Sequence, residues 1–166
     1  IGKILLIITF VTLTNGINIT LIDLNNFYFL FLALAIRNSV NESWGYFDIR
    51  PNAHMFWWLY SSPQSSPQLP LVIWLQGGPG ASSTGFGNFE EVGPLDTKLK
   101  PRNTSWIQYA NLLFIDNPIG TGFSYVDNVN ALTKNNSQIA DDLVTFMKFF
   151  YKKFPNLQVR ITQLSN

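Results

Sequence analysis

The sequence predicts an α/β fold, with a mixed sheet flanked by helices. Two short apolar runs, 71–76 and 111–116, are rich in β-branched and aromatic residues, and a loop rich in glycine and proline follows each. A later segment, 137–154, carries apolar residues at helix spacing. Since ligands of open α/β sheets bind at the carboxyl ends of parallel strands, the loops after the two runs are the first candidates for a site.

The first 36 residues differ in kind from the rest. Apolar stretches at 4–13 and 27–36 have the length of the hydrophobic part of a signal peptide, and neither reaches the ~20 residues that a membrane span needs. Small-x-small sequences at 33–35 and, more weakly, at 14–16 have the form of a signal-peptidase site. We expect 1–36 to be a signal-peptide-like segment, with a membrane anchor or a wrongly assigned extension of the gene as the alternatives.

Four N-x-S/T sequons add to the prediction of secretion. They are candidate glycosylation sites, because this motif accepts N-linked glycans in secreted and lumenal proteins. Sequons also arise by chance in a sequence rich in asparagine, so they support secretion without establishing it. The four lie at Asn18, Asn41, Asn103 and Asn135.

The next elements are expected to be strands. Runs at 46–50 and 53–60, joined by a Pro-Asn turn, predict a hairpin at the edge of the sheet. A loop rich in serine, proline and glutamine, 61–70, leads into the strand at 71–76. The strand at 111–116 follows later in the chain and is expected to lie parallel to it, because each ends in a loop of the same kind.

The helix predicted at 137–154 closes the regular part of the chain. Its sequence places Asp141 and Asp142 in the first turn and two lysines in the last turn, where they would complement the helix dipole. Pro155 ends the helix. A strand should follow, but 157–166 is poor strand material, and we expect it to be a divergent tail.

Composition excludes several classes of function. The formal net charge is +1 and no basic run exceeds a pair of lysines, so nothing predicts nucleic-acid binding. Cysteine is absent, which rules out disulfides and thiolate metal sites, and His54 is the only histidine. We therefore expect no metal and no cofactor. The apolar fraction of 46% is enough for the core of one ordinary domain.

The motif that says most about function is the glycine-rich loop in "WLQGGPGASSTGFGNFEEVGPLD", 74–96. It matches neither of the phosphate-binding patterns G-x-x-x-x-G-K-S/T and G-x-G-x-x-G. One interpretation is a tight turn into a helix capped by Ser82 or Ser83. The other is an oxyanion hole, in which exposed backbone N–H groups stabilise the charge that develops on a carbonyl oxygen. The residues alone leave both interpretations open.

Three stretches of the chain together resemble the serine carboxypeptidase family: "LPLVIWLQGGPGASSTGFGNFEEVGPLD", "LKPRNTSWIQYANLLFIDNPIGTGFSYV" and "MFWWLY". The similarity is strongest to an animal branch in which Gln precedes GGPG. It implies that 37–156 is a partial serine carboxypeptidase domain, the N-terminal half of an α/β-hydrolase fold with an incomplete sheet. It also implies a secreted or lysosomal enzyme that releases C-terminal residues from peptides and proteins by acyl-enzyme hydrolysis.

The resemblance also assigns roles to residues around the glycine-rich loop. Gly78 would supply an N–H group of the oxyanion hole. Trp74, Gln76, Gly77 and Glu91 would bind the terminal carboxylate of the substrate. An acid in contact with a carboxylate has to be protonated, because two ionised carboxylates repel, so the resemblance implies activity at acidic pH.

The catalytic residues of the family are not found in this sequence. The resemblance implies that Ser, Asp and His follow the 137–154 helix, with the serine in G-x-S-x-G, and this motif is absent. His54 precedes the glycine-rich loop in an apolar strand and is expected to be a packing or edge residue. Ser124 lacks the glycines of a nucleophile elbow and is expected to pack in the wall of its loop.

Two readings of function follow. The first is part of a serine carboxypeptidase, from a truncated gene model, a splice product or a partial sequence, and inactive alone. The alternative is a non-catalytic secretory glycoprotein that binds peptide C-termini or a partner. In both, contact with a membrane would be transient and would use only the signal-like segment.

Overall fold

The structure is a computed structural model that describes residues 41–64, 69–78, 80–158 and 162–165. The signal-like segment and the sequon at Asn18 therefore lie outside the described residues. Within the described part, no helix is both long enough and apolar enough to cross a membrane.

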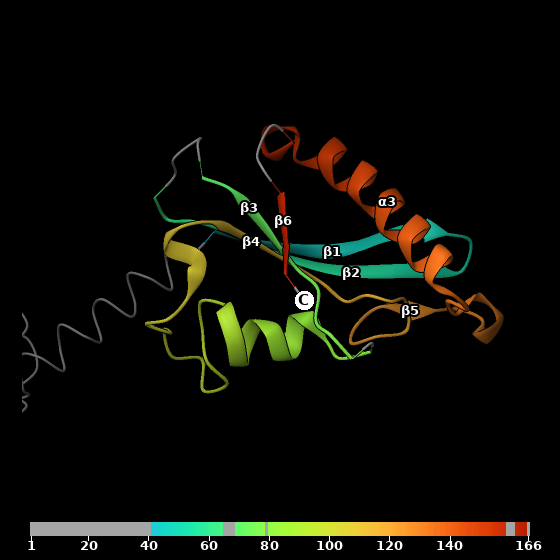
Figure 1. Ribbon diagram of the computed structural model, residues 1–166, viewed down its shortest axis with the longest axis horizontal. Helices are drawn as coiled ribbons and strands as arrows, with labels where there is room; N and C mark the ends of the chain where they lie inside the picture. The colour runs from blue at the N-terminus through green and yellow to red at the C-terminus, as the bar shows by residue number, and fades with distance from the viewer. Residues whose placement is uncertain (1–40, 65–68, 79, 159–161, 166) are drawn as a thin grey trace, which may run out of the picture. The chain divides into compact units, whose positions relative to one another are not determined.

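The described strands form a mixed sheet, as the sequence predicts (Figure 1). Its order is β1-β2-β4-β3-β6, and the short β5 pairs with β2 beside this path. The first two pairings in that order are antiparallel, whereas β3 pairs in parallel with both β4 and β6. The strands are β1 (Asn41–Arg50), β2 (Ala53–Ser61), β3 (Leu71–Trp74), β4 (Asn111–Ile115), β5 (Tyr125–Val126) and β6 (Thr162–Ser165).

The β1–β2 hairpin confirms the predicted edge hairpin. The strands join at Pro51 and Asn52, and Asn52 has a φ of 61°, which asparagine tolerates in turns. β1 begins at Asn41 rather than at residue 46, and it is an edge strand of the sheet. The hairpin therefore presents the sequon at Asn41 at the start of an exposed edge.

The central strands β3 and β4 are buried on both faces, which explains their continuous apolar runs. Leu71 and Ile73 pack in one core with Phe146 of helix α3 (Asn136–Lys153). Val72 packs in a second core with Val92 of helix η1 (Ser83–Val92). Side chains alternate along a strand, so α3 covers one face of the sheet and η1 covers the other (Figure 1). The described residues also include three short 3₁₀ turns: η2 (Trp106–Gln108), η3 (Val129–Ala131) and η4 (Pro155–Leu157).

Helix α3 lies within one residue of the predicted range at each end, but one detail of the prediction is wrong. The side chain of Asn135 caps the helix by accepting a hydrogen bond from the Gln138 N–H, so the first turn precedes Asp141 and Asp142 and contains no acidic residue. Asp142 instead points into the protein, where its carboxylate accepts hydrogen bonds from Arg50 at 2.9 and 3.3 Å. This partly buried pair joins the end of β1 to α3.

Strand β6 forms within 157–166, which the sequence marks as poor strand material. Thr162 lies opposite Leu71 and Ser165 opposite Trp74, in parallel register. The backbone N–H and C=O groups along the edge of β3 need hydrogen-bond partners. A neighbouring segment can therefore pair there as a strand even though its composition does not favour one. As a result β3, the strand that leads into the glycine-rich loop, has a partner on each side.

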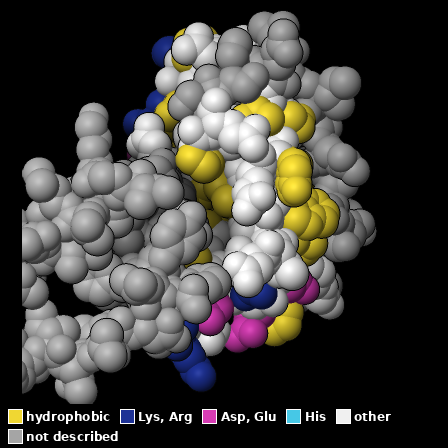
Figure 2. Space-filling view, turned by 90° about the vertical axis from the view of Figure 1, so that its left-hand side faces the viewer, with side chains coloured by type: hydrophobic (Ala, Val, Ile, Leu, Met, Phe, Trp, Pro, Cys, Tyr) yellow, Lys and Arg dark blue, Asp and Glu magenta, His cyan; other side chains and the backbone are white. Residues whose placement is uncertain are grey.

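The side of the protein that carries η2 exposes several large apolar side chains. Leu99, Trp106 and Tyr109 are 63%, 42% and 71% exposed. Figure 2, which views the molecule from the left-hand side of Figure 1, shows hydrophobic side chains over the middle of this face and charged side chains toward its lower edge. Scattered apolar side chains are ordinary on protein surfaces, so this face alone predicts no partner.

Candidate functional site

The glycine-rich loop begins at the carboxyl end of β3 and leads into η1. β3 ends at Trp74, two residues earlier than predicted, so Gln76 lies in the loop. Gly77 and Gly78 are exposed, and Gly78 has a φ of 134°, a conformation that side chains other than glycine rarely adopt. Substitution at Gly78 would therefore strain the backbone. The loop presents main chain to solvent at the end of a parallel strand, as expected of a binding site.

A hydrogen bond between two predicted site residues fixes the side chain of Gln76. The indole Nε1 of Trp74 donates to the amide Oε1 of Gln76 at 2.8 Å. This bond uses the amide oxygen and leaves the amide nitrogen, which has two N–H groups, to donate to a ligand. The backbone N–H of Gln76 in turn donates to Ser83 Oγ at 2.9 Å, which closes the loop. Both the backbone and the side chain of Gln76 are therefore held in place.

Gly87 is part of this arrangement and was not identified from the sequence. A Cβ atom at Gly87 would lie 2.4 Å from Trp74 Nε1 and 3.0 Å from Gln76 Oε1. Only glycine lets η1 approach the Trp74–Gln76 pair this closely. The available signal was a glycine inside a predicted helix, which often marks close packing.

Glu91 lies on η1, about one turn after Gly87. Its carboxylate oxygen Oε2 is buried and has no hydrogen-bond partner among the described residues. No hydrogen bond joins Glu91 to Trp74, Gln76 or Gly77 in this part of the chain. Because buried polar atoms are normally paired, the unpaired oxygen marks a place where a ligand or a further part of the protein can bond.

Asp116, directly after β4, links the glycine-rich loop to the next loop of the sheet. Its side chain is fully buried and accepts hydrogen bonds from Ser82, from Thr84 and from the backbone of Phe123. In the sequence, Asp116 is predicted only as the end of a strand. A charged residue that immediately follows a buried strand was the signal that could have singled it out.

Ser124 has the structural role expected from the sequence. Its hydroxyl donates to the carbonyl oxygen of Asp116 at 2.6 Å and accepts from the Phe56 N–H at 2.8 Å. Both hydrogen-bonding capacities of the hydroxyl are therefore used inside the protein. These two hydrogen bonds hold the loop after β4 against β2.

His54 also has a structural position, near the start of β2 between β1 and β5. Its Nδ1 lies 2.6 Å from Asp48 Oδ1, its Nε2 lies 2.9 Å from Asp127 Oδ2, and its ring stacks on Tyr125. The hydrogen bond to Asp127, followed by that to Asp48, raises the pKa of His54 above its ordinary value. His54 joins β1, β2 and the chain after β5.

The described sequons are accessible. Asn41, Asn103 and Asn135 are all exposed. Asn135 caps α3 through its Oδ1, so its amide nitrogen, the atom that accepts a glycan, remains available. Glycosylation at these positions stays a prediction.

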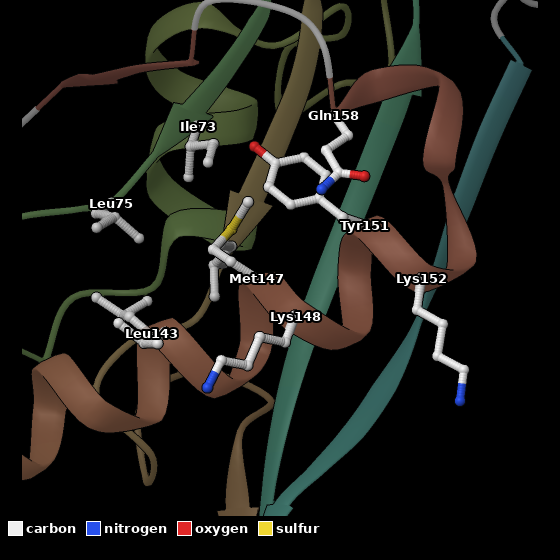
Figure 3. Close-up of a pocket in the computed structure, with 10 residues that line it drawn as sticks. Ile73, Leu75, Leu143, Met147, Lys148, Tyr151, Lys152 and Gln158 are labelled. Carbon is white, nitrogen blue, oxygen red and sulfur yellow. The ribbon is translucent and has the colours of Figure 1, made fainter.

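A hollow lies on the other face of the sheet, between β3 and α3 (Figure 3). It has a volume of about 700 Å³ and is lined mainly by apolar side chains, among them Ile73, Leu75, Leu143 and Met147. Figure 3 shows the strand residues and the helix residues facing each other across it. Within the described residues, no group of three or more His, Asp or Glu side chains is placed to hold a metal ion. The polar groups described above lie around the glycine-rich loop rather than in this hollow.

Comparison with known proteins gives a consistent result. The serine carboxypeptidase family model matches residues 34–164. The retinoid-inducible serine carboxypeptidase of Mus musculus is 59% identical over 113 residues, which cover 66% of this chain and 25% of that protein, and its Homo sapiens counterpart is 57% identical over the same shares. Serine carboxypeptidase-like 51 of Arabidopsis thaliana is 48% identical over 71% of this chain and 27% of its own length. The chain thus spans about a quarter of the length of the curated relatives it matches.

Proposed function

Because the chain belongs to the serine carboxypeptidase family, we propose that it forms the part of an α/β-hydrolase enzyme that binds the terminal carboxylate of a peptide and contributes to the oxyanion hole. The observation that carries the proposal is the Trp74–Gln76 hydrogen bond at 2.8 Å. It holds the amide of Gln76 beside the glycine-rich loop with its donor end unused. A carboxylate is the ligand that such a donor suits best.

The binding half of the site acts on the end of the peptide. Gln76 donates from its amide nitrogen to the substrate carboxylate, Trp74 orients that amide, and Gly77 lines the approach with backbone alone. Glu91 contributes through its unpaired buried oxygen, as a protonated donor to the carboxylate or to another acid. A peptide that ends in an amide cannot use these contacts fully, so the site selects free C-termini.

The catalytic half acts on the scissile carbonyl. The Gly78 N–H donates to the oxyanion of the tetrahedral intermediate, and a second donor would come from the residue after the nucleophile. On this proposal the serine, aspartate and histidine belong to other parts of the complete enzyme, and the 166-residue chain releases no amino acids from peptides. Release above a no-protein control that is lost in Gly78→Val would contradict this.

The same proposal places the protein in the secretory pathway, as a secreted or lysosomal enzyme. The support is the exposure of the sequons at Asn41, Asn103 and Asn135. Expression in a secreting cell followed by treatment with an N-glycosidase tests it. A mass that does not change on treatment would argue against secretion.

The experiment that tests the function replaces Gln76 in the full-length enzyme that contains this segment. Gln76→Ala should lower kcat/KM for free-acid peptides by about 10- to 100-fold, since a charge-assisted hydrogen bond contributes roughly 1.5–3 kcal/mol. Amidated peptides should be affected much less. Gln108→Ala, an exposed glutamine on η2, is the matched control. Equal slowing of both substrates would show that Gln76 is a structural support, and wild-type binding of free C-termini without hydrolysis would favour the non-catalytic alternative.

A further inference from the structure

We propose that Asp116 is the positioning residue of the oxyanion loop: its buried carboxylate anchors the junction between GGPG and η1 and so fixes the place of the Gly78 N–H. The inference rests on the proposed role of Gly78 and adds a residue that neither the sequence nor the comparisons assign. Asp116 lies at the carboxyl end of β4, next to β3 in the sheet. It is therefore well placed to act on the loop that follows β3.

Both oxygens of Asp116 are fully used. Oδ1 accepts from Ser82 Oγ at 2.9 Å and from the Thr84 N–H at 3.0 Å. Oδ2 accepts from Thr84 Oγ1 at 2.7 Å and from the Phe123 N–H at 2.9 Å. A carboxylate has about four acceptor positions, so these four donors leave none for a substrate or water. The role of Asp116 is therefore to hold these neighbouring residues in place.

The charge of Asp116 makes this anchor a strong one. Its side chain is 0% exposed, and no ion pair to it occurs among the described residues. Hydrogen bonds to an ionised acceptor are roughly twice as strong as neutral ones. Two of its donors, Ser82 and Thr84, belong to the start of η1, where the helix dipole also favours a negative charge. The carboxylate thus stabilises the very residues that follow GGPG.

The neighbouring loop closes on the same carboxylate. A Cβ atom at Gly122 would lie 2.3 Å from Asp116 Oδ2 and 2.7 Å from Ser82 Oγ, and Gly122 has a φ of 55°. No other residue fits here without moving the carboxylate or the serine. The loops after β3 and β4 therefore meet at Asp116.

Three consecutive hydroxyl residues hold the two ends of the glycine-rich loop. Ser83 Oγ accepts from the Gln76 N–H and holds the loop at its beginning. Ser82 and Thr84 hold its end on Asp116. Gly78 lies between these two attachments, and only the second is bonded directly to Asp116. Loss of that attachment should displace Gly78 while Gln76 stays in place.

The test is Asp116→Asn in the full-length enzyme that contains this segment. The new side-chain amide carries N–H groups that would face the donors previously bonded to the carboxylate. Because two donors cannot bond to each other, the junction between GGPG and η1 should shift. We expect kcat to fall by about 10- to 100-fold, because a displacement of about 1 Å at an oxyanion donor costs rates of that order. KM for free-acid peptides should change by less than about 3-fold, because ground-state binding depends on Gln76.

The matched control is Asp142→Asn, which removes another buried carboxylate, on the α3 face. It should lower thermal stability and leave kcat and KM unchanged. Equal loss of kcat in both variants, or a change in KM as large as that in kcat, would overturn the positioning role. Thr84→Val removes a single donor from Asp116 and serves if Asp116→Asn does not fold; it should also lower kcat and spare KM, and an unchanged kcat would overturn the inference.

Hydrogen exchange separates this inference from the proposed function. In the 166-residue chain, Asp116→Asn should speed exchange of the Thr84 and Phe123 amides, which donate to the carboxylate, and leave the Gln76 amide protected. Unchanged exchange at Thr84 and Phe123 would overturn the anchor whatever the activity. An inactive wild-type full-length protein would overturn the proposed function and leave the exchange result to decide on the anchor.

Discussion

At the scale of single residues, the indole nitrogen of Trp74 has a role distinct from that of its ring. The ring packs against Trp106, with centroids 5.8 Å apart, whereas Nε1 bonds to Gln76. Trp74→Phe keeps an aromatic ring, removes the Nε1 donor and also shrinks the ring system. Compared with Trp106→Phe, which loses the same ring volume, it reports on the orientation of the Gln76 amide.

We predict that Trp74→Phe lowers kcat/KM for free-acid peptides by about 3- to 10-fold, the size of one neutral hydrogen bond. Added to Gln76→Ala it should have almost no further effect, because both substitutions remove one interaction. Kinetics of the two single variants and the double variant measure this coupling. Trp106→Phe, which leaves Nε1 of Trp74 intact, is the control. Additive losses in the double variant would show that Trp74 acts independently of Gln76.

The candidate site shows which residues a sequence can reveal. Gln76, Gly77 and Gly78 are contiguous and form a pattern in the chain. Gly87 and Asp116 act through contacts with residues that lie well before them in the sequence, such as the bond between Thr84 and Asp116. No local sequence pattern predicts such contacts. The binding and catalytic roles of Trp74, Gln76, Gly77, Gly78 and Glu91 stay predictions.

At the scale of elements, the tip of the β1–β2 hairpin carries a pH-dependent contact. His54 lies between Asp48 on β1 and Asp127 after β5, and Tyr125 stacks on its ring at 4.5 Å. The hydrogen bonds to Asp127 and Asp48 raise its pKa above the ordinary value of 6.5. A raised pKa means that the folded protein holds the proton more tightly than the unfolded chain.

The sign of the pH dependence follows. The contribution of His54 to stability is fully present below pH 6.5 and is lost as the pH rises through the raised pKa. We predict that the Tm of the wild type exceeds that of His54→Asn most at pH 5, and that the difference shrinks toward pH 9. Thermal melts of both proteins across this range measure it. A difference that stays constant or grows with pH would contradict the prediction.

The elements that the sequence predicted well are those with a local periodic signal. The hairpin, β3, β4 and α3 all occur, with boundaries displaced by up to five residues. β6 was missed because it depends on the exposed edge of β3 rather than on its own composition. The π-helical form of η1 was missed because its hydrogen bonds, such as that from Gly93 to Asn88, follow from packing that the apolar spacing does not encode.

At the scale of the whole molecule, the hollow between β3 and α3 leaves apolar surface open to solvent. Val144, which lines it, is 54% exposed, and the neighbouring Leu143 and Met147 are partly exposed. An accessible apolar surface of this kind binds hydrophobic dyes and promotes association. We therefore expect the α3 face to bind hydrophobic ligands.

We predict that the 166-residue chain binds the dye ANS and that Val144→Glu lowers its fluorescence by about half, since a negative charge in the hollow opposes both the apolar rings and the sulfonate of the dye. Val129→Glu is the control, because Val129 is 74% exposed on η3 and does not line the hollow. Dye titration with light scattering measures binding and association together. Equal fluorescence in the two variants would place the dye site elsewhere.

The parallel pairing of β3 with β6 sets an order of events during synthesis. β1 and β2 are joined by a two-residue turn, whereas β6 lies roughly 90 residues beyond β3, and distant pairings form late. At a translation rate of roughly 5–20 residues per second, β3 waits on the order of 5–20 s for this partner. Throughout that interval, one edge of the strand that leads to Gln76 and Gly78 remains unpaired on the nascent chain. The site-bearing strand is thus the one for which a chaperone at the ribosome has the longest opportunity to act.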